Sequence, residues 1–351
     1  MKRLRIAIAG AGGQGRKHLA NCLRLKNTEV VAVADRSKSL LSIMSKRGIR
    51  TYQDYREMIN KEKLDAVIIS LPNYLHEDCA LASTEAGCDI LIEKPLARNT
   101  DEAKQIAKHV RKKGVKLMVG MCHRFIPDCR RLKEEIDAET LGRIDFASAL
   151  FFAGPFTSGR GVSEWLFDAD KSGGGALLDS GCHLIDLFLW FFGDVHTVVG
   201  HTESVFHLGY DDYAEVLMRF KNGVNAVAVT SWRSRIPCYH IEVAGEYGRR
   251  TGFSKKFGIF DIGLRRGLLS FMSESISQRI RGRPFLPLGD DIYYNELDYF
   301  VKCVLNDEEP KPGVDDWLKV SEVIDLAYRN QEMKEKIALN AACMKFRGDE
   351  L

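Results

Sequence analysis

Three titratable side chains, Asp179, His183 and Asp186, interrupt an apolar segment that follows the glycines at 173–175. If residues 176–192 form a helix, the spacing predicts that all three share one narrow stripe, because each residue advances about 100° around the axis. Asp179 can then reach His183 one turn away and raise its basicity. This arrangement suits a general base that takes a proton from a secondary alcohol. Asp186 lies deeper among bulky aromatics, and we expect it to be a structural hydrogen-bond partner.

A second candidate for chemistry is Lys94, which stands between Glu93 and Pro95 at the end of an apolar run. Pro95 restricts the backbone of the residue before it, so the ammonium group is aimed in one direction. A lysine held at the mouth of a cleft can donate to a substrate hydroxyl and stabilise negative charge that develops on oxygen. Simpler interpretations exist for both features: Lys94 as a solvated loop lysine, and His183 as a satisfied core histidine.

A glycine-rich segment near the N-terminus, IAIAGAGGQGRKH, indicates a phosphate-binding turn between a strand and a helix. It fits the G-x-G-x-x-G pattern of dinucleotide-binding domains, and Asp35 follows 20 residues after its last glycine, where a carboxylate can accept from ribose hydroxyls. Asp35 favours NAD because it repels a 2′-phosphate, whereas Arg36 could accommodate that phosphate in NADP. The predicted contacts here are Gly10, Gly12, Gly13, Gln14, Gly15, Asp35 and Arg36.

The length and spacing of the apolar runs predict two domains, residues 1–121 and 122–351. The first part alternates short, nearly continuous apolar runs with segments of helical period, which is typical of a doubly wound parallel α/β sheet. In the second part, longer alternating runs follow one another through turns such as KNG and indicate an α+β domain with a mostly antiparallel sheet. Its predicted helices span 176–192, 293–305 and 316–337.

Composition excludes several classes of function. The 351 residues include 51 basic and 48 acidic side chains, which are dispersed, so we expect no nucleic-acid partner. The sequence begins without a secretory signal, and its longest apolar run, 184–192, is too short to span a bilayer. We therefore expect a cytoplasmic protein that does not bind membranes. The nine cysteines include no C-x-x-C pair, so we expect reduced thiols and no bound metal.

Taken together, the motifs resemble the Gfo/Idh/MocA family of oxidoreductases, which is named after glucose-fructose oxidoreductase, inositol dehydrogenase and a rhizopine-catabolism protein. The resemblance runs over essentially the full length, and the order and spacing of the short motifs make chance similarity very unlikely. The motifs are GAGGQGRKH (10–18), LPNYLHEDCALASTEAGCDILIEKPLA (71–97), GMCHRFIP (120–127), SGGGALLDSGCHLIDLFLWFFG (172–193), VTSWR (229–233) and the tail that begins YYNELDYFVKCV.

The resemblance implies a Rossmann domain followed by a domain with a large, mostly antiparallel open sheet, which often serves as an oligomer interface. We therefore expect a homodimer or homotetramer. By the family pattern, His183 is the acid/base, Asp179 its partner and Lys94 an electrostatic aid. The pattern also implies that further residues line or support the cofactor cleft: Leu71, Pro72, Asn73, His76, Glu93, Lys94 and Arg124. One departure is His123, where many relatives have Asn or Arg, and it puts the local substrate contacts in doubt.

Substrate choice is expected to come from the second domain. Side chains predicted to face substrate are Lys94, Trp165, Asp179, His183, Arg233, Arg235 and His240. The basic segment within 254–289 fits an oligomer arm or a lid, or contacts to a phosphorylated or nucleotide-linked sugar. The sequence thus predicts an NAD-dependent dehydrogenase or reductase acting on a secondary alcohol or ketone of a sugar, cyclitol or related polyol. The alternatives are an NAD-dependent glycosidase of the same fold and a non-catalytic dinucleotide-binding sensor or scaffold.

Overall fold

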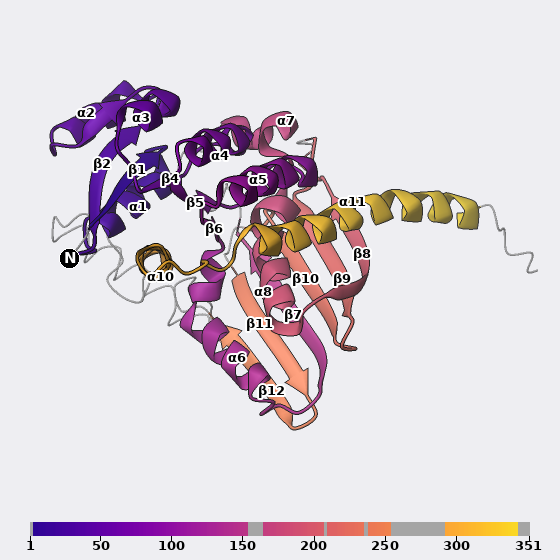
Figure 1. Cartoon of the computed structure of the whole chain (residues 1–351). Helices are drawn as coiled ribbons and strands as arrows, with labels where there is room; N and C mark the ends of the chain where they lie inside the picture. Colours follow the sequence, from indigo (N-terminus) through magenta and orange to yellow (C-terminus); the bar gives the residue numbers. More distant parts are fainter. Residues whose placement is uncertain (1–2, 154–163, 207–208, 235–237, 254–291, 343–351) are drawn as a thin grey trace, which may run out of the picture.

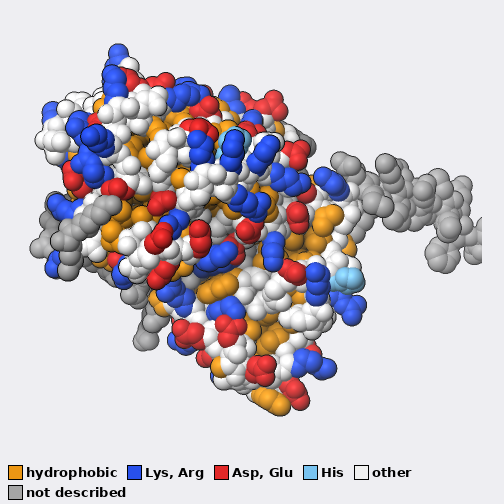
Figure 2. All heavy atoms as spheres, in the orientation of Figure 1, with side chains coloured by type: hydrophobic (Ala, Val, Ile, Leu, Met, Phe, Trp, Pro, Cys, Tyr) orange, Lys and Arg blue, Asp and Glu red, His pale blue; other side chains and the backbone are white. Residues whose placement is uncertain are grey.

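A computed structural model describes residues 3–153, 164–206, 209–234, 238–253 and 292–342 (Figure 1). The predicted substrate contact Arg235 and the basic segment within 254–289 lie outside the described residues. Over the described part, basic and acidic side chains intermingle on the face seen in Figure 2. This agrees with the dispersed charge of the sequence.

Sheet A is a six-stranded parallel sheet with the strand order β3-β2-β1-β4-β5-β6. Its central strands are apolar on both faces, and Ile6, Ala7 and Ile8 are all fully buried. The strands are β1 (Leu4–Ala9), β2 (Thr28–Ala34), β3 (Arg50–Tyr52), β4 (Ala66–Ile69), β5 (Asp89–Glu93) and β6 (Leu117–Gly120). The predicted parallel α/β sheet is confirmed, with the short β3 as an additional edge strand.

Helices connect these strands, and the strand order reverses between β1 and β4. Such a switch point leaves a crevice at the carboxyl ends of the strands, where dinucleotides bind in open α/β sheets. It lies where β1 ends in the glycine-rich loop. The connecting helices are α1 (Gly13–Cys22), α2 (Lys38–Ser45), α3 (Tyr55–Lys61), η1 (Asn73–Leu75), α4 (His76–Glu85) and α5 (Thr100–Lys113).

Sheet B is a mixed, mostly antiparallel sheet with the order β12-β11-β7-β10-β9-β8. Its only parallel pair among the described strands joins β7 to β10. The strands are β7 (Ile144–Phe152), β8 (Val195–Glu203), β9 (Tyr213–Phe220), β10 (Asn225–Ser231), β11 (Cys238–Gly245) and β12 (Gly248–Phe253). In β7, buried Ala147, Ala149 and Phe151 alternate with more exposed residues, so one face of the sheet is packed and the other is open.

The predicted helix at 176–192 covers the packed face of sheet B, but it is not one regular α-helix. Its first turn, η4 (Leu177–Gly181), is π-helical and is followed by α8 (Cys182–Phe192). The span Ala169–Phe192 is long and apolar enough to cross a membrane by length and composition, yet 83% of its apolar window is buried inside the protein. Because α8 is apolar on nearly every side and is buried in this way, it is a core helix.

Among the described residues, four further helical elements precede η4 in the sequence after sheet A, and two longer helices follow sheet B. They are η2 (Cys122–Phe125), α6 (Pro127–Asp137), η3 (Glu164–Phe167), α7 (Ala169–Ser172), α10 (Ile292–Leu305) and α11 (Val314–Ala342). On α10, Leu297 and Phe300 are buried in the same cluster as Ile6 and Ile8 of β1. Helix α11 packs along α5, α8 and β8 and then continues past the sheet (Figure 1). Helix α10 therefore packs on the side of sheet A, and α11 joins elements of sheet A to β8 of sheet B.

Candidate active site

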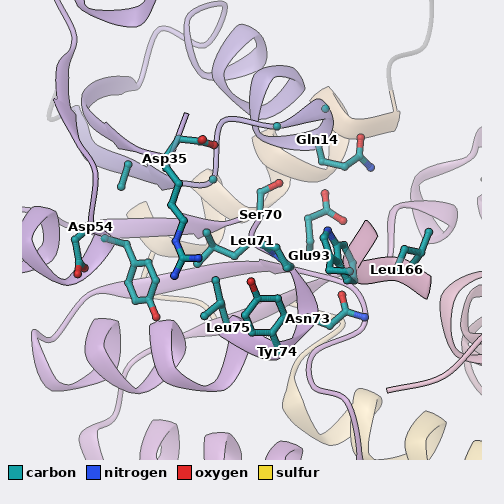
Figure 3. Close-up of a pocket in the computed structure, with 18 of the residues that line it drawn as sticks. Gln14, Asp35, Asp54, Ser70, Leu71, Asn73, Tyr74, Leu75, Glu93 and Leu166 are labelled. Atoms are coloured by element: carbon teal, nitrogen blue, oxygen red, sulfur yellow. The ribbon is translucent and has the colours of Figure 1, made fainter. Parts of the chain in front are cut away.

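A cleft of about 610 Å³ opens at the carboxyl ends of the strands of sheet A (Figure 3). The glycine-rich loop and the ends of β2, β4 and β5 form one wall, while η3 and η4 supply the other. Many predicted site residues line it: Gly10, Gly12, Gly13, Gln14, Asp35, Arg36, Leu71, Pro72, Asn73, Glu93, Lys94, Trp165 and Asp179. The fold thus brings together residues from both halves of the sequence.

The three glycines of the loop have different surroundings. Gly10 has φ +95°, and a Cβ there would lie 2.3 Å from the carbonyl oxygen of Ser70. A Cβ on Gly15 would lie 1.8 Å from the carbonyl oxygen of Gly10, so only glycine lets the helix pack this closely. A Cβ on Gly12 would meet nothing within 4 Å in the described structure. Gly12 therefore leaves open the space in which a pyrophosphate can approach the N-terminus of α1.

Asp35 is fixed by two backbone N–H groups at the end of β2. Its Oδ2 accepts from Ala11 at 2.7 Å, and its Oδ1 accepts from Ser37 at 2.7 Å. The carboxylate faces the cleft (Figure 3), with lone pairs left to accept from ribose hydroxyls. Arg36 lines the same part of the cleft and is exposed. The open space at Gly12 and the oriented acid at Asp35 fit a bound NAD.

Lys94 and Asp179 meet across the inner part of the cleft. The Lys94 Nζ lies 2.7 Å from Asp179 Oδ1 and also donates to the Asp179 backbone carbonyl at 2.7 Å. Burial opposes the charge on Lys94, but the neighbouring Asp179 carboxylate outweighs it and raises the pKa of the lysine. The Lys94 side chain is 17% exposed, so it still reaches the cleft. Lys94 is therefore a fixed positive charge at this end of the cleft.

His183 lies in the core near Lys94, with 4% of its surface exposed, and it is not among the described residues that line the cleft. Its ring stacks on His123, with centroids 3.9 Å apart and planes inclined by 17°. Burial, His123 and Lys94 together hold the pKa of His183 well below its ordinary value. A neutral imidazole is the form that accepts a proton.

The expected bond between Asp179 and His183 is replaced by other contacts. The Asp179 carboxylate accepts from Lys94 and from Ser180 Oγ at 3.2 Å, and His183 Nδ1 has no hydrogen-bond partner among the described residues. The physical reason is the π-helical turn, which changes the angle between positions 179 and 183 from that of a regular α-helix.

Asp186, one turn further along α8, forms a buried ion pair with Arg124. The Arg124 Nε and Nη2 donate to its two oxygens at 2.8 and 2.7 Å, and Nη2 also approaches Asp316 at 3.2 Å. Burial raises the pKa of Asp186, and Arg124 partly offsets this. The prediction that Asp186 is a structural partner is confirmed. Arg124 is not among the cleft-lining residues; it lies behind them and joins η2, α8 and α11.

Two further predicted cofactor residues connect loops around the cleft. The ring of His76 lies between the carbonyl oxygens of Leu71, 2.8 Å from Nε2, and Pro95, 2.7 Å from Nδ1. Asn73 Nδ2 donates to the carbonyl of Ser172 at 2.7 Å. His76 thus fixes the turn that carries Lys94, and Asn73 joins that region to the second half of the chain.

The predicted substrate residues do not all reach the cleft. Trp165, on η3, lines it. Arg233 instead binds Asp212 and Glu203 and lies over the ring of Tyr213. His240 lies on β11 with its Nε2 3.7 Å from a carboxylate oxygen of Glu242, and neither Arg233 nor His240 is among the described residues that line the cleft.

Several cleft residues were not predicted from the sequence. They are Ala34, Gln53, Asp54, Tyr55, Arg56, Ser70, Tyr74, Leu75 and Leu166. Ser70 and Ala34 end predicted strands, so their place at the carboxyl edge gave a usable signal. Residues 53–56 follow β3, and β3 is too short to be predicted from the pattern of apolar residues.

A buried acid near the cleft was also missed. Glu296 on α10 is fully buried, and neither of its carboxylate oxygens has a hydrogen-bond partner among the described residues. Burial and the nearby Glu93 raise its pKa well above the ordinary value. Glu93 itself forms a buried 2.7 Å contact with His18 Nε2. The pair of acids therefore divides into a charged Glu93 and a neutral Glu296 behind the turn that carries Lys94.

Cys122, His123 and His183 have ligating atoms within 4.8 Å of one another. The histidine rings are stacked 3.9 Å apart, so their in-plane lone pairs lie in two separate, nearly parallel planes, which suits shared ligation of one ion poorly, and Lys94 adds positive charge nearby. The arrangement favours a stacked pair over a chelate. The expectation that no metal binds stays a prediction.

Comparison with known proteins places the chain in a family. Residues 4–121 match the model of an oxidoreductase family with an NAD-binding Rossmann fold, and residues 129–250 match the GFO/IDH/MocA C-terminal domain. The chain belongs to the Gfo/Idh/MocA oxidoreductase family. The family assignment made from the motifs is thus confirmed, and with it the prediction of an NAD-binding enzyme.

Two curated Gfo/Idh/MocA relatives and one solved structure illustrate the similarity. The chain is 26% identical to D-xylose 1-dehydrogenase (NADP(+)) 2 of Haloferax volcanii, over 95% of this chain and 99% of the relative. It is 26% identical to myo-inositol 2-dehydrogenase of Thermotoga maritima, over 89% and 92% of the two chains. The crystal structure of GenD2 from gentamicin A biosynthesis in complex with NAD superposes with a TM-score of 0.80, at 24% identity and 95% coverage of each chain. The last similarity supports the fold.

The glycine loop gives a paired test of fold and cofactor binding. We expect Gly15→Ala to lower the free energy of unfolding by at least about 2 kcal/mol, because its methyl group would collide with the Gly10 carbonyl. We expect Gly12→Ala to change that free energy by less than about 1 kcal/mol. Gly12→Ala should nevertheless weaken NAD binding at least about tenfold, because the methyl group occupies the space left for the pyrophosphate.

Chemical denaturation and calorimetric titration with NAD measure the two effects. Unimpaired NAD binding by a folded Gly12→Ala protein would contradict this placement of the cofactor.

Proposed function

We propose that this enzyme transfers a hydride between NAD and a secondary alcohol, or the corresponding ketone, of a small sugar or cyclitol. The observation that carries the proposal is the meeting of Lys94 and Asp179 at the inner part of the cleft, next to the buried, neutral His183. The names of the relatives, D-xylose and myo-inositol dehydrogenases, support this class of substrate. In this proposal residues 1–121 hold the cofactor and 122–351 supply most substrate and subunit contacts.

The residues of the cleft divide the work of the reaction. NAD, when bound between the space at Gly12 and the carboxylate of Asp35, supplies the hydride acceptor. Lys94 uses two donor contacts on Asp179 and has a third N–H to offer to the substrate oxygen. That ammonium stabilises the negative charge that develops on this oxygen. His183 accepts the hydroxyl proton in the oxidative direction and returns it to the oxygen in the reductive direction.

The wall opposite the glycine loop suits a small polyol. Trp165 and Leu166 on η3 give it apolar surface beside the charged pair. Polar groups from Asp179 and Asn73 lie in the same cleft. A few polar groups set among apolar walls are typical of sites that orient small neutral ligands.

We further propose that the enzyme is a cytoplasmic homo-oligomer that pairs through the open face of sheet B. Phe146 is 45% exposed and Leu217 is 53% exposed on this face. Val227 pairs with Leu217 across β9 and β10, so the two side chains point to the same side, and Val229 follows on that side two residues later. An exposed apolar sheet face of this kind is typical of an interface, and a second copy of the chain is the partner we infer. Cell fractionation tests the compartment.

The oligomer proposal predicts that Leu217→Glu separates the subunits. A carboxylate at the centre of an apolar interface loses its hydration without gaining a partner, so association is weakened. Sedimentation equilibrium of the purified protein should change from an oligomeric mass to that of one 39.6 kDa chain. Leu23→Glu, the same change at an exposed leucine at the end of α1 and away from sheet B, is the control. An unchanged oligomer in Leu217→Glu, or a monomeric wild-type protein, would contradict the proposal.

The catalytic proposal predicts a strong loss of turnover in Lys94→Met and His183→Ala with NAD affinity retained. Removal of the charge at the developing oxyanion, or of the base, should lower kcat at least about 100-fold. A panel of sugars, cyclitols and their phosphorylated and nucleotide-linked forms, assayed with NAD and NADP by nicotinamide absorbance, identifies the substrate for this measurement.

Lys61→Met and His201→Ala, which change exposed side chains away from the cleft, are the matched controls. Near-normal turnover of either active-site variant would remove the proposed roles.

A further inference from the structure

We propose that His123 is a positioning residue, whose ring holds the imidazole of His183 in the orientation from which it exchanges the substrate proton. The stacked pair of His123 and His183 is the juxtaposition that carries this inference. It rests on the proposed role of His183 as the acid/base. Neither histidine is among the described residues that line the cleft; His183 is the one proposed to exchange the proton, so His123 acts through it.

A catalytic histidine needs something to fix its ring, and hydrogen bonds do not do so at Nδ1 of His183. In most such sites the second ring nitrogen donates to a carboxylate or a carbonyl, which sets both the tautomer and the ring orientation. Here Nδ1 is buried without a hydrogen-bond partner among the described residues. The carboxylate expected to serve this purpose, Asp179, accepts from Lys94 and Ser180 instead.

Stacking supplies the missing constraint. Rotation about the terminal torsion of a histidine side chain is soft, so an unconstrained ring samples a wide range of angles. The His123 ring covers one face of His183 at 3.9 Å and 17°, and a ring that turned would lose that contact and collide with its neighbour. Phe151 approaches His183 at 6.2 Å with a tilt of 58°, which is too far and too inclined to replace the stack.

His123 is in turn clamped by neighbouring rings. Tyr239 meets it edge-on at 4.8 Å, and Phe151 packs against it at 5.2 Å with a tilt of 56°. His123 is 3% exposed, and Tyr239 is 1% exposed. These contacts from β7 and β11 fix the ring of His123, so the ring can hold that of His183.

The electrostatics of the pair keep both rings uncharged. Burial, together with Lys94, lowers the pKa of His123 to about 3. The charged or titratable groups packed around the pair are Lys94 from β5, Cys122 from η2, Tyr239 from β11, and Asp179 and Cys182 on the helical segment of His183 itself. A neutral His123 adds no proton of its own to the site, so His183 is available to take the proton of the alcohol.

Two replacements of His123 separate ring orientation from protonation. His123→Phe keeps a flat ring on His183 but removes the titratable nitrogens, whereas His123→Leu keeps much of the apolar volume and removes the flat face. We expect His123→Phe to retain kcat within about threefold, and His123→Leu to lower it at least about tenfold, because a displaced base transfers protons poorly. The KM for the polyol and the affinity for NAD should stay unchanged in both, since residue 123 is not among the described residues that line the cleft.

The pH profile gives a readout that a purely structural role would not move. The oxidative kcat/KM falls as the pH drops through the pKa of His183, because only the neutral ring accepts the proton. Burial is the main cause that lowers this pKa, so a His183 ring that stays in the stack of His123→Phe should keep the wild-type acidic limb, whereas a ring displaced toward water in His123→Leu should show that limb at higher pH. ¹⁵N-histidine NMR of the protein without substrate should show the same upward shift for the His183 ring in His123→Leu.

Phe220→Leu is the matched packing control, because it loosens a buried ring contact with Phe192 on the same helix and sheet, away from the stack of His123 on His183. Thermal unfolding of all variants confirms that they are folded, and we expect Phe220→Leu to keep the wild-type kcat. Wild-type kcat in His123→Leu, or an equal loss in His123→Phe and His123→Leu, would overturn the positioning role. His183→Ala tells the two proposals apart, since its full activity would refute the acid/base role on which this inference rests.

Discussion

The ion pair between Lys94 and Asp179 is the interaction on which the rest of the site depends. The two residues are 85 positions apart in the sequence, and the contact joins the end of β5 in sheet A to the helical segment that covers sheet B. The Lys94 side chain is 17% exposed and that of Asp179 is 33% exposed, so loss of Asp179 would leave a mostly buried lysine without its counter-charge. The pair therefore fixes the distance between the end of sheet A and the helical segment that carries His183.

Other contacts between distant segments of the chain also hold the cleft together. Arg124 bonds to Asp186 and Asp316 behind the site, and Asn73 bonds to the backbone of Ser172 at its rim. Buried, bidentate contacts such as that of Arg124 impose a narrow geometry. The result is a cleft whose walls come from distant parts of the chain yet are held in register, as hydride transfer over a short distance requires.

The site also places a charged lysine close to two neutral histidines. Lys94 stays charged because Asp179 is beside it, while His183 and His123 stay neutral because they are buried near that same lysine. Environments that separate the pKa values of neighbouring groups assign their roles as acid, base and electrostatic aid. In the proposed mechanism, the one positive charge of Lys94 has two effects: it stabilises the developing oxyanion and it helps to keep His183 unprotonated.

Local patterns in the sequence predicted most of the fold and the side of the cleft formed by the glycine-rich loop and Asp35. Continuous apolar runs indicated the buried strands of sheet A, and the glycine spacing with Asp35 indicated the dinucleotide turn. Such local patterns cannot predict contacts that depend on tertiary packing. The π-helical turn at Leu177–Gly181 directs Asp179 toward Lys94. Arg233 forms ion pairs with Glu203 of β8 and with Asp212, the residue before β9. The stacking of His123 on His183 likewise joins residues 60 positions apart, which no local periodicity can show.

The most direct test of the central claim is the path of the hydrogen. The enzyme is incubated with NAD and myo-inositol, or the polyol that the substrate panel selects, deuterated at every carbinol carbon, and the reduced nicotinamide is analysed by mass spectrometry and proton NMR. Direct transfer within the cleft predicts one deuterium per reduced nicotinamide, located at C4. Reduced nicotinamide that carries no deuterium would contradict the account.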